Sequence, residues 1–216
     1  MNAHALASAE SLDAIAAALA GPASQPDKDL LEAFTRSFYV RVPDDELRSR
    51  DAAEWDAIAR SFLAFARQRA PGTVSVSIGS PGQAVDGYES THTVVRIVND
   101  DMPFLVDSVR MALSKFDITL HQIAHPVVSL RRDAAGQLQA VGEGEAESLM
   151  YLEIDRQADA GAMAAIEEAI REALADVRSA VADWSQMREK MLEIAGEIPA
   201  RAMPVEPACR AETEAF

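Results

Sequence analysis

The apolar positions in the first third of the chain recur at helical spacing. Residues three or four positions apart lie on one face of a helix. These positions are Leu30, Leu31, Phe34, Phe38, Trp55, Ile58, Phe62 and Leu63. Pro71 and Gly72 end the pattern, so we predict a helical segment over residues 25–72. Residues 1–24 are rich in Ala and Ser and have no core to pack on, so we expect a flexible N-terminus there.

The spacing changes to alternation after this helical segment. Val74, Val76 and Ile78 alternate with serines, which is typical of a strand with one buried face. The predicted strands are residues 74–78, 93–98, 118–131 and 148–155, several of them dense in β-branched residues. The predicted helices are residues 103–116 and a longer one from residue 160, which we expect to break near Asp183.

The order of these elements, β-β-α-β-β-α, predicts an α+β fold. A strand–helix–strand unit favours a right-handed crossover, and two such units sharing one sheet make a ferredoxin-like sandwich. The usual order ends on a strand, whereas here the extra strand, 74–78, comes first. We expect it to pair antiparallel with 93–98 at the sheet edge, which would be a permuted ferredoxin-like sheet. The predicted domain spans residues 73–182, followed by a helical extension over 183–197 and a linker over 198–216.

Alternation along the strands predicts a mixed surface on the sheet face away from the two helices. Such a surface, neither dry core nor freely solvated, commonly packs on another domain or subunit. The residues that we predict for this interface are Arg96, His121, His125, Tyr151 and Glu153. Arg96 and Glu153 would lie on neighbouring strands, where a cross-strand ion pair can form.

Composition limits the partners of the protein. The formal net charge of −15, from 35 acidic and 20 basic residues, would repel phosphate backbones, so nucleic acid is not an expected partner. No apolar run has membrane-spanning length, and the start lacks the features of a signal peptide. The single cysteine, Cys209, excludes an intramolecular disulfide. We therefore expect a soluble, cytoplasmic protein without a membrane partner.

The sequence lacks the patterns that carry chemistry in enzymes. It contains no Gly-x-Gly-x-x-Gly run after a strand, so no dinucleotide site is expected. His121 and His125 are four residues apart, and on a strand this spacing separates their Cα atoms by about 13 Å, too far for one metal ion. We expect no catalytic, cofactor-binding or metal site in this chain.

A motif around the predicted helix 103–116 resembles a known family. The run of residues 97–109, Ile-Val-Asn-Asp-Asp-Met-Pro-Phe-Leu-Val-Asp-Ser-Val, is similar to the hallmark of the large NAD-specific glutamate dehydrogenases of bacteria. Further segments that resemble the family in the same order are residues 39–43, 125–133, 147–155 and 176–184. Several long motifs in order make this resemblance specific.

The resemblance implies a division between the parent protein and this chain. The parent would convert L-glutamate, NAD and water to 2-oxoglutarate, ammonium and NADH, and it would assemble as a homo-oligomer. Its amino-terminal part contains ACT-type domains, a ferredoxin-like regulatory class that often binds amino acids, while the catalytic region lies far downstream. NAD is thus expected for the parent and no cofactor for this chain. Because residues 211–216 end on what looks like the start of a helix, we expect this sequence to be a piece of a longer chain.

The turn before helix 103–116 admits two interpretations. In ACT-type domains this turn often contacts an amino-acid effector, and the candidate residues here are Asn99, Asp100, Asp101, Met102 and Phe104. Free N–H groups at a helix start can hold a carboxylate. The preferred interpretation is that the acids cap the helix, since Asn and Asp are favoured caps and Phe104 stands where typical ACT domains have glycine.

Three functions remain open from the sequence. The first is a regulatory and assembly domain of a glutamate dehydrogenase. The second is a stand-alone sensor that binds an amino acid, and the third is a ligand-free scaffold for oligomer contacts. An independent enzyme is disfavoured, because no nucleophile–base pair, metal cluster or phosphate loop is apparent.

Overall fold

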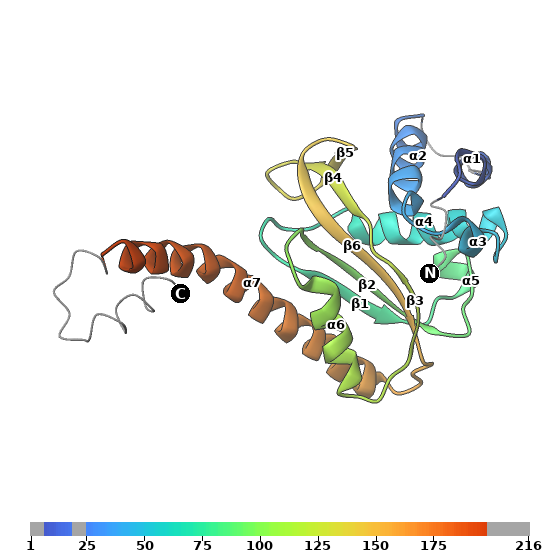
Figure 1. Ribbon diagram of the computed structural model, residues 1–216. Coiled ribbons are helices and arrows are strands. Elements are labelled where there is room, and N and C mark those ends of the chain that lie inside the picture. The colour runs from blue at the N-terminus through green and yellow to red at the C-terminus, as the bar shows by residue number, and fades with distance from the viewer. Residues whose placement is uncertain (1–6, 19–24, 198–216) are drawn as a thin grey trace. The chain divides into compact units, whose positions relative to one another are not determined.

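The computed structural model describes residues 7–18 and 25–197 (Figure 1). Its helices are α1 (Ala9–Ala17), α2 (Gln25–Tyr39), α3 (Asp44–Leu47), α4 (Ala52–Ala66), α5 (Gln83–Asp86), α6 (Leu105–Ser114) and α7 (Ala160–Glu197). Its strands are β1 (Ser75–Gly79), β2 (Thr93–Asp100), β3 (Leu120–Ala124), β4 (Val127–Arg132), β5 (Leu138–Val141) and β6 (Glu145–Ile154). The chain divides into two compact units, residues 1–174 and 175–216. The predicted linker over residues 198–216, with Cys209, lies outside the described residues.

The six strands form one antiparallel sheet. Its order is β1-β2-β6-β4-β5, and β3 also pairs with β6. Strand β6 therefore lies between β2 and β3, which are joined by α6 and run parallel to each other with one strand between them. This split β-α-β arrangement is the ferredoxin-like topology that the order of elements predicts. Strand β1 pairs antiparallel with β2 at the sheet edge, as expected, with Val76 opposite Ile97.

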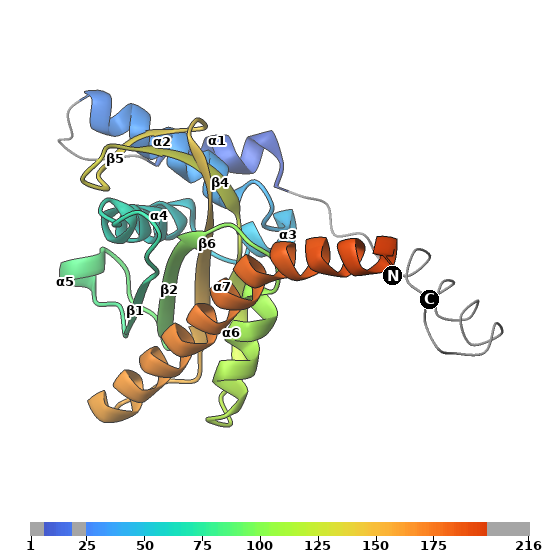
Figure 2. The same ribbon diagram turned by 90° about the vertical axis from the view of Figure 1, so that its left-hand side faces the viewer.

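One face of the sheet packs on α6 and the first part of α7. Figures 1 and 2 show α6 on the side of the sheet opposite to α2 and α4. The buried apolar residues on this side include Val95, Ile97, Leu105, Val109, Leu113, Met150, Leu152, Ile154, Ile166 and Ile170. The even-numbered positions of β6 and the odd-numbered positions of β2 point here, because successive side chains of a strand alternate between faces.

The other face of the sheet is covered by the N-terminal helices of the same chain. Helix α2 contacts β4 and β5, and α4 contacts β2. The shared core includes Phe34, Phe38, Tyr39, Trp55, Ile58, Phe62, Val94, Val98, Leu149 and Tyr151. We expected this face to pack on another domain or subunit, and its helical cover here belongs to the chain itself. The predicted helical segment and the sheet therefore share a core.

Helix α1 joins this core through Ile15, which is buried. At its start, Ser8 and Ser11 both donate hydroxyl hydrogen bonds to Asp44 Oδ1, at 2.8 and 2.6 Å. The hydrogen bonds from Ser11 and Ser8 lower the pKa of Asp44 to about 2. We expected a loosely attached segment over residues 1–24. Within its described part, residues 7–18, these contacts attach α1 to the first residue of α3.

The described part of the second unit, residues 175–197, is the continuation of α7. The expected break near Asp183 is wrong, because the helix continues without interruption. Asp, Trp and Ser each cost only a few tenths of a kcal/mol in a helix, which flanking helix formers overcome. The exposed apolar residues of this part are Trp184, Met187, Met191, Leu192 and Ile194. No helix among the described residues is long and apolar enough to cross a membrane.

Candidate functional site

Part of the segment predicted as a turn before α6 belongs to strand β2. Asn99 and Asp100 continue β2 and face Ser148 and Glu147 of β6. The backbone N–H of Asp101 donates to Ala146 O at 3.1 Å, which extends the same ladder. The residue that caps α6 is Phe104, and no side chain makes a capping hydrogen bond to the helix. The predicted capping of α6 by Asn99, Asp100 or Asp101 is therefore wrong, because Asn99 and Asp100 lie in β2 and the helix begins later, with Phe104 as its N-cap.

Phe104 adopts an unusual backbone conformation at the helix start. Its φ angle is 70°, in the left-handed region that non-glycine residues seldom adopt. Phe104 is 71% exposed, so core packing does not account for this conformation. Met102 is half-buried beside it, and Asp101 is exposed. The candidate effector residues are thus split: Asn99 and Asp100 belong to the sheet, while Asp101, Met102 and Phe104 form the turn.

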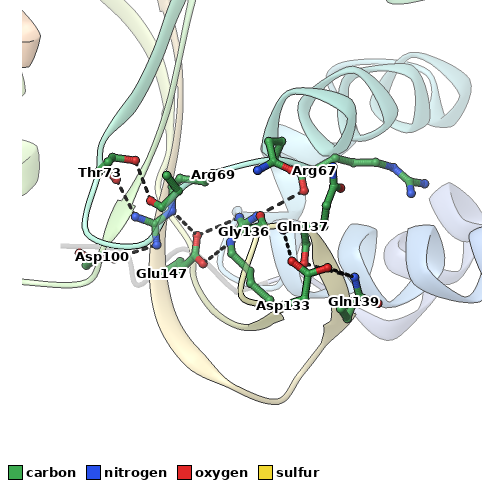
Figure 3. A network of polar contacts seen from close by, with 12 residues as sticks. Arg67, Arg69, Thr73, Asp100, Asp133, Gly136, Gln137, Gln139 and Glu147 are labelled. Atoms are coloured by element: carbon green, nitrogen blue, oxygen red, sulfur yellow. Dashed lines mark hydrogen bonds and ion pairs between the residues drawn. The ribbon is translucent and has the colours of Figure 1, made fainter.

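A buried charge network lies behind this turn (Figure 3). The guanidinium of Arg69 donates to Glu147 Oε2 at 3.0 Å, to Asp100 Oδ1 at 2.8 Å and to Thr73 O at 2.6 Å. The guanidinium of Arg132 donates to both oxygens of Glu147, at 2.6 and 3.0 Å. The side chains of Arg69, Arg132 and Glu147 are 4%, 8% and 2% exposed. Arg69 and Arg132 therefore both bind the buried carboxylate of Glu147, and Arg69 also binds Asp100 at the end of β2.

The network keeps its charges through mutual hydrogen bonding. Burial alone would lower the pKa of Arg69, but its bonds to Glu147 and Asp100 outweigh burial and leave that pKa raised. A buried ion pair of this kind stabilises little relative to apolar packing, but loss of one member leaves an uncompensated charge. Glu147 is fully engaged by two cations, so its role in this fold is structural.

The same network fixes a close backbone approach between the end of α4 and the β4–β5 turn. The N–H of Arg69 donates to Gly136 O at 3.1 Å, and the N–H of Leu138 donates to Arg67 O at 2.9 Å. Gly136 has φ of 85°, and a Cβ at this position would overlap the carbonyl oxygen of Arg69. Asp133 closes the turn by accepting from the N–H groups at 135 and 137 (Figure 3). The sequence suggests a turn here but not its contact with the helix.

The predicted interface residues of the sheet meet the chain's own helices. Glu153 is buried, accepts from Arg50 of the α3–α4 turn at 2.7 Å and from the hydroxyl of Tyr151 at 2.8 Å. Arg96 pairs with Asp86 of α5 at 3.3 Å. The expected ion pair between Arg96 and Glu153 is therefore wrong. Tyr151 stands opposite Arg96 in the strand register, and each charge finds a partner on a covering segment instead.

Alternation along the strand placed His121 and His125 together on the sheet face away from α6 and α7, but the structure does not place them together there. The register shifts between Leu120 and Gln122, and a bulge of this kind moves the following side chains to the opposite faces. His125 bonds to the hydroxyl of Ser148 at 2.6 Å, and burial lowers the pKa of its imidazole. Because Ser148 alternates with the core residue Leu149, His125 lies on the α6 side of the sheet.

His121 belongs to a surface cluster that sequence reasoning missed. Its Nε2 lies 2.7 Å from Asp155 Oδ1, and its ring centroid lies 4.3 Å from that of His92. The backbone N–H of Thr119 and His121 together lower the pKa of Asp155. No sequence signal links His92 to His121, because a loop brings them together. Within residues 7–18 and 25–197, no group of three or more His, Cys, Asp or Glu side chains is arranged to hold a metal ion.

Buried ion pairs link the helical segment to the sheet, with Arg50 bound to Glu153 and Arg69 bound to Glu147. Trp55 is a core residue whose Nε1 donates to Leu47 O at 2.7 Å, whereas Trp184 is 60% exposed. The described non-glycine residues with a positive φ are Phe104, at the start of α6, and Asp117, just after its end, and both are exposed.

Comparison with known proteins agrees with the motifs. The sequence model for the "Glutamate dehydrogenase, ACT1 domain" family matches residues 34–170, from α2 into α7. The chain is 37% identical over 168 residues to an NAD-specific glutamate dehydrogenase of Pseudomonas aeruginosa, which covers 74% of this chain. It is 33% identical over 204 residues to an NAD-specific glutamate dehydrogenase of Halomonas elongata, which covers 89% of it.

The chain spans 10% and 13% of the lengths of these two relatives. The family match includes the hallmark run 97–109, the Arg69–Glu147–Arg132 network and both layers of helices. More than half of the chain lies within it. The chain therefore belongs to the family of glutamate dehydrogenase ACT1 domains.

Proposed function

We propose that this chain is a non-catalytic, amino-terminal regulatory and assembly domain of an NAD-specific glutamate dehydrogenase. The observation that carries this proposal is the family match over residues 34–170, together with relatives that bear that name. The parent protein would oxidise L-glutamate with NAD and water to 2-oxoglutarate, ammonium and NADH. The acids and bases of the described core support a non-catalytic role for the domain, because Glu147, Glu153 and Asp86 are each held by an arginine.

An activity assay on two proteins tests this proposal. NADH formation from L-glutamate and NAD is measured for the 216-residue chain and for the complete product of its gene. The proposal predicts activity in the complete product and none in the 216-residue chain. Turnover by the 216-residue chain, or a complete product that does not oxidise glutamate, would contradict it.

An amino-acid effector bound at the turn 101–104 is a second candidate function for the same domain. It is favoured by the strained backbone and exposed ring of Phe104, since such outliers concentrate at sites of function. The first-turn N–H groups of α6 would receive the carboxylate, and exposed Asp101 would receive the ammonium group. Asp107, also in the first turn, opposes carboxylate binding, so the ammonium contact must contribute.

Thermal-shift titration of the 216-residue chain with the amino acids, one at a time, separates a sensor from a scaffold. A ligand at a hundredfold excess over its Kd stabilises the folded state by about 2.7 kcal/mol, which raises the melting temperature. The sensor predicts that Asp101→Asn abolishes the shift while Glu143→Gln, an exposed acid in the β5–β6 turn, leaves it intact. No shift at millimolar concentrations would favour a ligand-free scaffold.

A further inference from the structure

Helix α7 carries an apolar pattern that repeats every seven residues. Over residues 163–194 an apolar residue recurs at intervals of three and four residues in strict alternation. These positions are Met163, Ile166, Ile170, Ala173, Val177, Ala180, Trp184, Met187, Met191 and Ile194. A heptad pattern sustained over several repeats is typical of a helix that packs along its length, as in a coiled coil.

The two ends of this pattern differ in exposure. In the first unit, Ile166 and Ile170 are buried. In the second unit, the pattern from residue 180 onward is exposed, and its members are Ala180, Trp184, Met187, Met191 and Ile194. We call these five residues the α7 stripe. The described part of the chain thus leaves uncovered a stripe with the spacing of a helix–helix interface.

An exposed stripe of this kind is stabilised by a partner helix. Burial of a large apolar side chain contributes about 1.5–3 kcal/mol, and Trp184, Met187, Met191 and Ile194 are all large and apolar. A short helix is marginal in water by itself, because most helical stability in proteins comes from packing of an apolar face. We therefore expect residues 180–194 to pack on another helix.

Charge disfavours a membrane as the partner. Helices that lie on lipid surfaces are rich in Lys and Arg on their polar face. Acidic side chains outnumber basic ones over residues 175–197, namely Asp176, Asp183, Glu189, Glu193 and Glu197 against Arg178, Arg188 and Lys190. Anionic lipid would repel this helix, so a protein helix is the better occupant.

The charges beside the α7 stripe fit a second copy of the same helix in parallel orientation. In a parallel coiled coil, the residue before each first heptad position lies beside the residue five positions later in the partner helix. With Trp184 and Met191 at first positions, Asp183 of each copy would lie beside Arg188 of the other. The next such pair is Lys190 with Ala195, which adds no contact between like charges.

Antiparallel orientation brings like charges together. If the two α7 stripes are aligned end to end, Arg188 meets Arg188 and Lys190 meets Lys190 of the other copy. A shift by one heptad removes these contacts but sets Asp176 against Glu197. Charge therefore favours the parallel orientation.

We propose that two copies of this chain associate through a parallel, two-stranded coiled coil formed by their α7 stripes. A two-fold axis along the helices sets each residue of the stripe against its own counterpart. The paired segment, residues 180–194, is about 22 Å long at about 1.5 Å per residue. So short a pairing is weak by itself, and tethering within an assembled parent would raise the effective concentration of the two helices. This inference deepens the assembly role proposed above and rests on it for its biological meaning.

Analytical ultracentrifugation of the 216-residue chain from micromolar to millimolar concentration tests the pairing. Two adjacent positions give matched variants: Met191→Asp in the α7 stripe and Leu192→Asp outside it, where Met191 and Leu192 are 68% and 59% exposed. Both variants place the same residue in the same helical turn, so the cost to the helix itself is shared. We expect a reversible dimer for the unmodified chain and for Leu192→Asp. The Met191→Asp dimer should be weaker by about tenfold or more, because association would bury a charge.

Two further measurements test the contacts and the direction of the helices. Arg188→Asp sets acids together and should weaken the dimer, whereas the double variant Asp183→Arg, Arg188→Asp exchanges the charges and should restore it. Ile194→Cys in a Cys209→Ser background should form a disulfide-linked dimer on oxidation with copper phenanthroline, because parallel pairing sets the two positions opposite each other. Antiparallel pairing would separate these positions by about 15 Å or more, beyond the reach of a disulfide.

Each other outcome overturns the proposal. A chain that is monomeric at all concentrations contradicts it, and sedimentation of that monomer with phosphatidylserine vesicles would assign the α7 stripe to lipid. A dimer that Met191→Asp leaves unchanged, or that Leu192→Asp weakens equally, also contradicts it. A dimer without rescue by the double variant, or without linkage at position 194, is not this coiled coil. The test needs no catalysis, so an inactive complete protein would refute the dehydrogenase proposal alone, and a monomeric chain would refute the pairing alone.

Discussion

The substitution Gly136→Ala tests the contact between the β4–β5 turn and the end of α4. A Cβ at Gly136 would overlap the carbonyl oxygen of Arg69 and lie 2.7 Å from its carbonyl carbon. Both atoms belong to the backbone, so no side-chain rotation relieves the overlap. The positive φ of 85° adds a conformational cost for any residue with a Cβ.

Gly142→Ala is the matched control, because Gly142 has φ of 90° in the next turn but no atom within 4 Å of an added Cβ. Both variants incur about 1–2 kcal/mol for the left-handed backbone. Gly136→Ala incurs a further cost of about 1–3 kcal/mol from steric overlap. The free energy of unfolding should therefore fall by about 2–5 kcal/mol for Gly136→Ala and by about 1–2 kcal/mol for Gly142→Ala.

Urea denaturation of the 216-residue chain, followed by circular dichroism at one protein concentration, measures both values. A larger loss for Gly136→Ala supports the contact with Arg69. Equal losses for the two variants would refute the reasoning, because they would leave only the shared backbone cost and no close approach between the two segments.

Two further predictions concern charged groups. Glu147→Gln leaves Arg69 and Arg132 buried without their carboxylate, so it should lower the free energy of unfolding by about 3–5 kcal/mol. In the control Glu143→Gln the lost ion pair is exposed, so the free energy of unfolding should change by under about 1 kcal/mol. Comparable losses for the two variants in urea denaturation would contradict the network. The depressed pKa of Asp44 means that its contribution to stability is present above pH 3.8 and is lost as the pH falls through about 2. A carboxyl NMR titration of the folded chain should give a midpoint for Asp44 near pH 2, and a midpoint at pH 3.8 would contradict the hydrogen bonds from Ser8 and Ser11.

Several helices and strands could be predicted from the sequence, because the spacing of apolar residues reflects the local geometry of the backbone. Val74, Val76 and Ile78 alternate, and their strand forms at the predicted edge of the sheet. The core helices α2 and α4 also lie in the predicted helical segment. Periodicity does not report what covers a sheet face, so the packing of α2 and α4 on β2, β4 and β5 could not be read from it.

The details of the site depend on tertiary contacts that local rules miss. Asn99 and Asp100 are favoured helix caps, but the ladder with Ser148 and Glu147 of β6 extends β2 through them. The bulge after Leu120 reverses the faces of the following residues, and no residue in that strand marks it in the sequence. The pairing of Arg69 with Glu147 joins positions 78 residues apart, whereas spacing rules relate only residues that are close together in the sequence.

We propose that this domain influences catalysis carried out elsewhere in a longer protein. The most direct test is the steady-state rate of NADH formation from L-glutamate by the complete gene product bearing Gly136→Ala or Gly142→Ala, with the oligomeric state measured on the same samples. The account predicts that Gly136→Ala, which destabilises the domain, alters the rate or the assembly much more than Gly142→Ala does. Identical kinetics and assembly for the two variants, with the domain of Gly136→Ala shown to be unfolded, would contradict it.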